Sequence, residues 1–211
     1  MKVAVVIPAK NEENTIGDVV RVCKAVSIID EVIVVSDGSD DKTAYLANIS
    51  GAKVIELPEN IGKGGAMMVG VNNTEAEVIL FLDADLIGLT INHVNDLLLP
   101  VLNGEVEMTV GVFEHGRLAT DLAQVIAPYL SGQRALKKTL LMQMSNLDVT
   151  RFGVEAALTR FAKDQGMNLK KVLLPNMSHV MKEEKLGLVK GFAARMKMYW
   201  EIALNANKKE D

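Results

Sequence analysis

The chain has 211 residues, of which 49% are hydrophobic and 24% charged, with a formal net charge of −4. This composition is that of an ordinary globular protein with room for one sizeable core. The acidic balance argues against a nucleic-acid binder, which usually carries a basic stripe, and no stretch approaches the roughly 18 apolar residues of a membrane span. The single cysteine, Cys23, excludes an internal disulfide and favours a cytoplasmic location.

The first hundred residues alternate between short apolar runs and helical patterns. The predicted strands are Lys2–Ile7, Glu31–Ser36, Lys53–Glu56 and Val78–Leu82, and the predicted helices are Glu13–Ala25, Lys42–Ile49, Gly65–Asn73 and Asn92–Leu102. Such alternation, with nearly continuous Val, Ile and Leu in the strands, indicates βαβ units and a mostly parallel sheet covered by helices.

The pattern loosens in the second half. A strand is predicted at Glu107–Phe113 and another in "NLKKVLLP", with helices near Leu118–Ala127, at Gly153–Gln165 and at Leu186–Asn207. No repeat or linker interrupts the chain, so one domain is expected. The apolar stripe of the last helix favours packing on its own domain or on a twin subunit, as a homodimer. Peripheral contact with the inner face of a membrane is the alternative.

Four polar segments follow the first four predicted strands: "PAKNEE", "DGSDD", "PENIGKGGA" and "DADL". In open parallel sheets, ligands bind beyond the carboxyl ends of the strands. The sequence therefore predicts that these segments converge on one binding site.

Asp83 and Asp85 are the strongest candidates for chemistry. Residues two apart in an extended chain point the same way, and two neighbouring carboxylates repel each other unless a hard cation such as Mg²⁺ or Mn²⁺ lies between them. His179, which follows the late strand in polar company, is a candidate third ligand. A solvated loop or a helix N-cap would account for the aspartates otherwise, and a surface position for the histidine.

The other segments are less specific. Asp37, directly at a strand end, could accept hydrogen bonds from a ribose or a base. The glycines around Lys63 would let backbone approach an anion at a helix N-terminus, although a structural turn explains them equally well, and the loop matches neither a P-loop nor a dinucleotide fingerprint. Helix capping accounts for Asn11, and the helix dipole favours an acid such as Glu12 in the first turn.

Taken in series, "VVIPAKNEENTIGDVV", "EVIVVSDGSDDKTA", "NIGKGGAMMVGV" and "VILFLDADL" resemble the family-2-type glycosyltransferases, especially dolichyl-phosphate-mannose-synthase-like and glucosyl-3-phosphoglycerate-synthase-like enzymes. The resemblance implies an α/β, GT-A (nucleotide-diphospho-sugar transferase) fold with a mostly parallel central sheet flanked by helices. It implies a single domain over residues 1–211, with a nucleotide-sugar-binding half at 1–116, an acceptor-binding half at 117–185 and a C-terminal helix at 186–211.

The resemblance also implies a nucleoside-diphosphate sugar donor, either a UDP- or a GDP-sugar. The residues that it places at the nucleotide sugar are Pro8, Ala9, Asn11, Glu12, Asp37, Lys63, Asp83 and Ala84. It implies Mg²⁺ or Mn²⁺ as the cofactor, held by Asp83, Asp85 and His179.

On the acceptor side the resemblance is partial. It implies acceptor contacts at Ser131, Gly132, Gln133 and Arg134, and in "RFGVEAALTRFA" it places Glu155 near the sugar or acceptor. The catalytic assignments are Asp85, Glu155 and Arg134. Many inverting relatives carry a Glu-Asp pair after the glycine, where this chain has Gln133 and Arg134. Either the acceptor is an anionic phosphate, small or polyprenyl-linked, that needs no base, or the enzyme retains anomeric configuration.

Two other interpretations account for fewer of these features. A non-catalytic nucleotide-sugar-binding module would have little use for the paired aspartates. A phosphatase of haloacid-dehalogenase type would carry its D-x-D on the first strand with Thr or Val after it, whereas Leu86 follows here.

Overall fold

The structure of the protein, a computed structural model, describes residues 1–113, 131–143 and 154–179. The chain divides into two compact units, Met1–Ser178 and His179–Asp211, and every described residue except His179 belongs to the first. The helices predicted at Leu118–Ala127 and Leu186–Asn207 lie outside the described residues.

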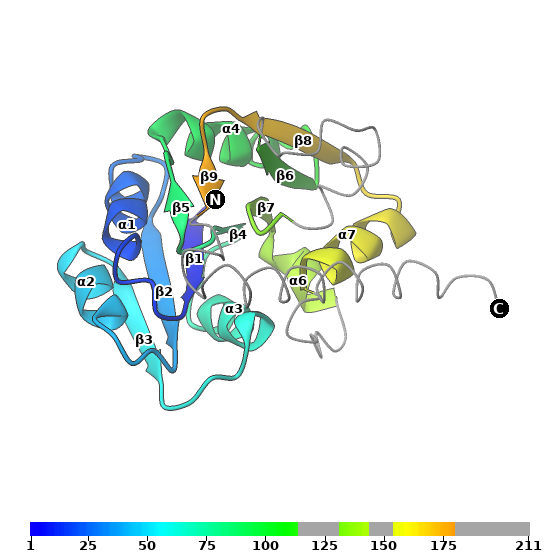
Figure 1. The fold of residues 1–211 in the computed structure, drawn as a ribbon. Helices are drawn as coiled ribbons and strands as arrows, with labels where there is room; N and C mark the ends of the chain where they lie inside the picture. The colour runs from blue at the N-terminus through cyan, green and yellow to red at the C-terminus, as the bar shows by residue number, and fades with distance from the viewer. Residues whose placement is uncertain (114–130, 144–153, 180–211) are drawn as a thin grey trace, which may run out of the picture. The chain divides into compact units, whose positions relative to one another are not determined.

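The first unit is built on a seven-stranded sheet with the order β3-β2-β1-β4-β7-β6-β8 (Figure 1). Its strands are β1 (Val3–Ala9), β2 (Glu31–Asp37), β3 (Lys53–Leu57), β4 (Val78–Phe81), β6 (Met108–Phe113), β7 (Arg134–Lys137) and β8 (Leu169–Leu174). Strands β1 to β4 pair in parallel, as do β6 and β8, and β7 runs antiparallel to both of its neighbours. The predicted mostly parallel sheet is therefore confirmed.

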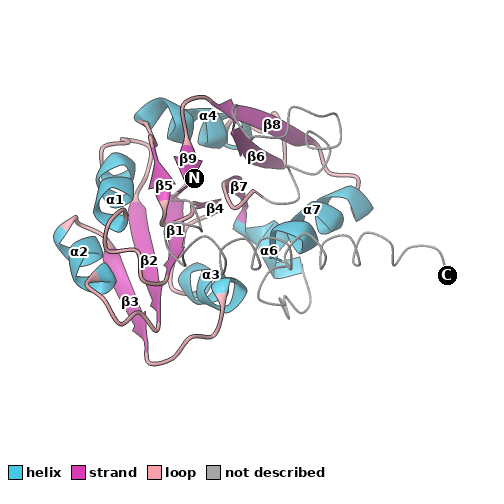
Figure 2. Ribbon diagram, in the orientation of Figure 1, coloured by secondary structure: helices cyan, strands magenta, loops and turns pink. Residues whose placement is uncertain are grey.

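Helices cover both faces of this sheet (Figure 2). They are α1 (Ile16–Lys24), α2 (Thr43–Ile49), α3 (Lys63–Asn72), α4 (Ile91–Leu102), α6 (Lys138–Gln143) and α7 (Val154–Asp164). A second, two-stranded sheet pairs β5 (Leu86–Ile87) with β9 (Ser178–His179).

The core lies in two layers because neighbouring residues of a strand point to opposite faces. In β1, Val5 joins one buried cluster with Ile16 of α1 and Leu97 of α4. Val6, the next residue, joins another cluster with Met67 of α3. A strand that is buried on both faces needs apolar residues at every position, which explains the continuous apolar run that opens the sequence.

The predicted strands and helices match the structure with shifts at their ends. Helix α1 begins at Ile16 rather than at Glu13, because the Glu12 carbonyl accepts the amides of Thr15 and Ile16 in a preceding turn. Strand β7 differs from the prediction from the sequence, which places an acceptor loop in "YLSGQRALKK". Within the part of the chain that the structure describes, no helix has the length and apolarity that crossing a bilayer requires.

Candidate active site at the carboxyl edge of the sheet

The loops that follow β1 and β2 are bound to each other at the carboxyl edge of the sheet. The Asn11 amide donates to Ser39 Oγ over 3.2 Å, and Asn11 Oδ1 accepts from the Asp40 amide over 2.9 Å. The Glu12 amide donates to Thr43 Oγ1 over 2.8 Å. Asn11 adopts a left-handed conformation with a φ of 54°, which asparagine tolerates better than most residues. The predicted convergence of these two segments is confirmed.

Asp37 joins this edge to the glycine-rich loop. It ends β2 with 4% of its surface exposed, and its two carboxylate oxygens accept from the backbone amides of Ile61 and Gly62 over 2.7 and 3.0 Å. The loop therefore enters α3 in a fixed position. A contact of Asp37 with a ribose or a base stays a prediction.

Two of the residues predicted at the nucleotide sugar contribute to the core. Ala9 and Ala84 are 3% and 4% exposed, and both belong to the larger buried cluster. Any contact of these two residues with the nucleotide sugar would therefore be made by their backbone, and it stays a prediction. Pro8 is half-buried at the end of β1.

Lys63, the first residue of α3, lies between two carboxylates. Its Nζ is 2.5 Å from Asp83 Oδ1 and 2.5 Å from Glu155 Oε1, and the three side chains are 31%, 15% and 12% exposed. Desolvation acts to lower the pKa of Lys63, but the charges and hydrogen bonds of Asp83 and Glu155 together raise that pKa above its ordinary value. Lys63 is therefore a fixed cation that links the end of β4 to the first turn of α7.

The predicted acceptor segment, residues 131–133, lies against Asp83. Gln133 is 1% exposed, and its Nε2 donates to Asp83 Oδ2 over 2.8 Å. Ser131 Oγ donates to Gln133 Oε1 over 2.9 Å. A Cβ added to Gly132 would lie 2.6 Å from Asp83 Oδ2 and 2.7 Å from Lys63 Nζ, so the segment packs directly on this ion pair. The Gln133 side chain points inward to Asp83 instead of outward to an acceptor.

Arg134 differs most from its prediction. Its side chain is completely buried; Nε donates to the Ser131 carbonyl and Nη1 to Thr159 Oγ1, each over 2.8 Å. A charged residue in a loop was expected to reach the acceptor, but β7 places this residue inside the sheet, between β4 and β6. The prediction that Arg134 contacts the acceptor is corrected accordingly.

Asp83, Asp85 and His179 meet the requirements for a divalent cation. Each offers one ligand atom, and these atoms lie within 4.8 Å of one another. Ligands on opposite sides of Mg²⁺ are about 4.2 Å apart, since each is about 2.1 Å from the ion, so closing around an ion needs only a small adjustment. Asp83 also accepts hydrogen bonds from Lys63 and Gln133, but a carboxylate has about four lone-pair sites. The carboxylates suit Mg²⁺ or Mn²⁺.

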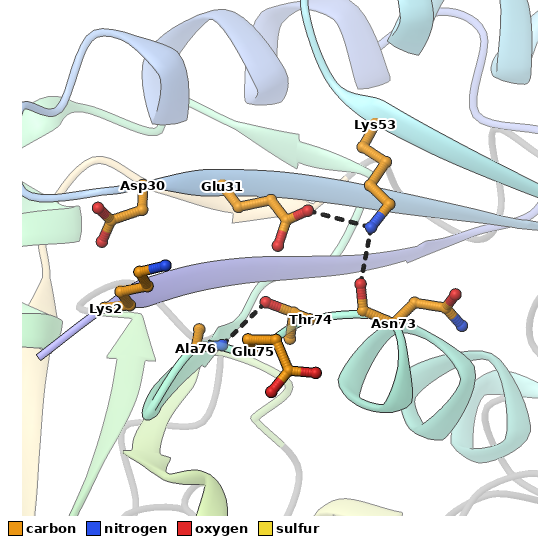
Figure 3. Close-up of a pocket in the computed structure, with 8 residues that line it drawn as sticks. All are labelled: Lys2, Asp30, Glu31, Lys53, Asn73, Thr74, Glu75 and Ala76. Atoms are coloured by element: carbon orange, nitrogen blue, oxygen red, sulfur yellow. Dashed lines mark hydrogen bonds and ion pairs between the residues drawn. The ribbon is translucent and has the colours of Figure 1, made fainter.

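A hollow of about 440 Å³ lies elsewhere, where β1, β2 and β3 begin (Figure 3). Lys53 Nζ donates there to Glu31 Oε1 over 3.2 Å and to the Asn73 carbonyl over 2.7 Å. Asp30, another lining residue, accepts from the Val3 amide over 2.7 Å. These groups stabilise the start of the sheet, and the hollow is separate from the candidate site at the carboxyl edge.

The fold and the site define an α/β protein with a D-x-D pair at the carboxyl edge of a mostly parallel sheet. A family model described as glycosyl transferase family 2 matches residues 4–165. The chain belongs to this family.

Individual relatives match a shorter stretch. Glucosyl-3-phosphoglycerate synthase of Mycolicibacterium smegmatis is 39% identical over an alignment of 109 residues that covers 47% of this chain and 36% of that protein. Dolichyl-phosphate beta-glucosyltransferase of Drosophila melanogaster is 36% identical over 101 residues, covering 40% of this chain and 31% of that protein. The matches therefore span about a third of the length of these curated relatives.

Solved structures confirm the predicted GT-A class of fold. Glucosyl-3-phosphoglycerate synthase from Mycobacterium tuberculosis, in complex with Mn²⁺, UDP and glucosyl-3-phosphoglycerate, has a TM-score of 0.72 at 30% identity, covering 85% of this chain and 72% of that chain. The complex of the same enzyme with Mg²⁺ and UDP has a TM-score of 0.73 at 29% identity, covering 85% and 71%. These relatives bind a divalent cation together with UDP.

Proposed function

We propose that the chain transfers a sugar from a nucleoside-diphosphate sugar to a phosphorylated acceptor, with the help of Mn²⁺ or Mg²⁺. The observation that carries the proposal is the cluster of ligand atoms from Asp83, Asp85 and His179 at the edge of the sheet. Family membership supports the reaction class, and relatives that bind UDP with Mn²⁺ or Mg²⁺ support the donor class.

Asp83, Asp85 and His179 would hold the cation, which when bound supplies Lewis-acid stabilisation of the charge on the leaving diphosphate. Lys63 supplies a second, permanent positive charge on the same side. Its Nζ is held between Asp83 and Glu155, so it does not need to reorganise as negative charge develops. The backbone at the start of α3 adds the positive end of a helix dipole beside it.

The acceptor side lacks a proton-accepting group where many inverting relatives carry one. Gln133 stands there, and a carboxamide does not take up a proton at neutral pH. A phosphate oxygen is already anionic and needs no base, which supports a phosphorylated acceptor. Retention of the anomeric configuration agrees with the same residues, and the anomer of the product, read by proton NMR, decides between the two routes.

Transfer assays on the full chain test this proposal. UDP-glucose or GDP-mannose is offered with phosphoglyceric acid, with and without Mn²⁺, and products are identified by mass spectrometry. A polyprenyl phosphate in a parallel arm tests the lipid-linked acceptor. We expect Mn²⁺-dependent product from the phosphoglyceric acid arm.

Asp85→Ala provides the sharpest comparison, because it removes one cation ligand. We expect a loss of at least about 100-fold in turnover, in line with losing several kcal/mol of charge stabilisation. Asp96→Ala, the same substitution at an exposed position of α4, is the matched control and should retain activity. Donor binding without turnover would instead support the non-catalytic module, and full activity of Asp85→Ala would refute the metal assignment.

A further inference from the structure

Arg134 is the largest side chain that the described part of the chain buries completely. It lies opposite Phe81 of β4 and Val110 of β6. Desolvation lowers the pKa of its guanidinium to about 10, although the charges of Glu155 and Asp83 act to raise it, so the group is a cation at neutral pH. Burying an ion costs several kcal/mol, and an apolar side chain would serve β7 without that cost.

The guanidinium connects two elements that meet at the candidate site. On one side, Nε donates to the Ser131 carbonyl over 2.8 Å. On the other, Nη1 donates to Thr159 Oγ1 over 2.8 Å. Because guanidinium is planar and its donors point in fixed directions, the two bonds fix segment 131–133 and helix α7 relative to each other.

Thr159 passes this constraint to the start of α7. It is 1% exposed, and its hydroxyl, while accepting from Arg134, donates to the Glu155 carbonyl over 2.9 Å. Glu155 carries the carboxylate that binds Lys63 Nζ. A shift of Thr159 would therefore move Glu155, whose carboxylate contacts Lys63 at the candidate site. Thr159 itself lies in the core.

We propose that Arg134 is a positioning residue, whose buried guanidinium sets the placement of segment 131–133 and of Glu155 around Asp83. The inference rests on the proposed function, because it identifies Arg134 as the residue that positions the acceptor side of that site. It replaces the acceptor contact expected for Arg134 from the sequence. A role limited to stability would tie Arg134 to folding alone and leave turnover per folded molecule unaffected.

The hydroxyl of Thr159 is the best place to test the link, because Thr159→Val removes it at nearly constant volume. Thr109→Val is the matched control. Thr109 is likewise completely buried, but its hydroxyl donates to the Leu97 carbonyl over 2.7 Å and accepts from the Ala135 amide over 3.3 Å. Both variants lose a buried hydroxyl, and only one of them interrupts the connection from Arg134 to Glu155.

We expect Thr159→Val to lower kcat for UDP-glucose at least about tenfold with little change in its KM, since a misplacement of about 1 Å can cost on the order of 100-fold. Thr109→Val should lower the melting temperature to a similar extent without that loss of kcat. Thr159→Ser, which keeps a hydroxyl, should recover most of the lost turnover. Equal kcat values for the two valine variants would overturn the proposal.

Hydrogen exchange provides a readout that does not depend on activity. We expect amides of α7 to exchange at least severalfold faster in Thr159→Val than in Thr109→Val or the unmodified chain. If the unmodified chain transfers no sugar in any arm, the proposed function fails while this measurement still decides the positioning role. Exchange across α7 that is the same in both valine variants would refute it.

Discussion

Gly132 allows a sharp test of how tightly the candidate site is packed. A Cβ at this position would meet both carboxylate oxygens of Asp83 and Nζ of Lys63, with 2.6 Å to Asp83 Oδ2. Restoring an ordinary contact of 3.4 Å with all three atoms requires a displacement of about 1 Å. Asp83 cannot turn away freely, because Gln133 and Lys63 bind its two oxygens and the buried strand β4 precedes it.

The displacement sets the size of the effects expected for Gly132→Ala. Inserting a methyl group into a well-packed site costs about 1–3 kcal/mol of stability. A misplacement of about 1 Å at a reacting site costs on the order of 100-fold in rate, so we expect turnover to fall by about one to two powers of ten. The donor KM should rise less, because most of the residues predicted to bind the nucleotide belong to β1, β2 and the loops that follow them.

Gly17→Ala is the matched control. Gly17 lies in α1, and a Cβ there would meet the ends of two flexible side chains, Ser50 Oγ at 3.2 Å and Arg21 Nη1 at 3.3 Å. Alanine also favours helix over glycine by up to about 1 kcal/mol, so this variant should be at least as stable as the unmodified chain. Urea unfolding gives the stabilities and Mn²⁺-dependent transfer from UDP-glucose gives the rates. A Gly132→Ala protein with unchanged stability and turnover would show that segment 131–133 does not pack on Asp83 and Lys63.

Two further predictions concern ionisable groups, Lys63 at the candidate site and Cys23 in the core. Lys63→Met leaves the Asp83 and Glu155 carboxylates without the cation between them. We expect the free energy of unfolding, measured in urea, to fall by about 1–3 kcal/mol. The loss is smaller than for a fully buried pair because the Lys63 side chain is 31% exposed. Lys63→Arg, which keeps the charge, should recover part of that stability; equal stability of Met and Arg variants would contradict the reasoning. Burial raises the pKa of the Cys23 thiol from an ordinary value of 9.0 to about 12, although a backbone hydrogen bond acts to lower it. Between those pH values the unfolded chain releases a proton that the folded chain keeps, so this thiol lowers stability by up to about 1.4 kcal/mol per pH unit as the pH rises. Cys23→Ala should lack this part of the pH slope in urea unfolding, and an identical slope in both proteins would refute the assignment; iodoacetamide at pH 8 should modify the thiol only after unfolding.

The strand and helix order of the first hundred residues could be predicted because it depends on local patterns. The buried strands β1 and β4 are apolar at almost every position, and α1 shows a helical apolar period. Their ends were predicted less well, because capping depends on single contacts such as the turn closed by the Glu12 carbonyl. Helix α3 begins at Lys63, two residues before the prediction, since Gly62, with a φ of 88°, ends the loop.

Strand β7 could not be predicted from its own residues. It begins with Arg134, and a charged residue beside Gly132 and Gln133 is typical of a solvated loop. What makes it a strand is its position between β4 and β6, which supply hydrogen bonds on both sides. Its register depends on contacts with residues about 25 and 55 positions away, which local periodicity does not report.

The candidate site was predicted at the level of residue types, and the contacts among those residues were not. The two aspartates in "DADL" suggested repulsion that only a metal would relieve, but the fold already places Lys63 beside Asp83. Lys63 and Glu155 are 92 positions apart, so no spacing rule connects them. Arg134, from a third element, contributes a second cation toward the same carboxylates. Since these two cations offset Asp83 and Glu155, the repulsion expected from the motif alone is already reduced at Asp83, and this became apparent only from the fold.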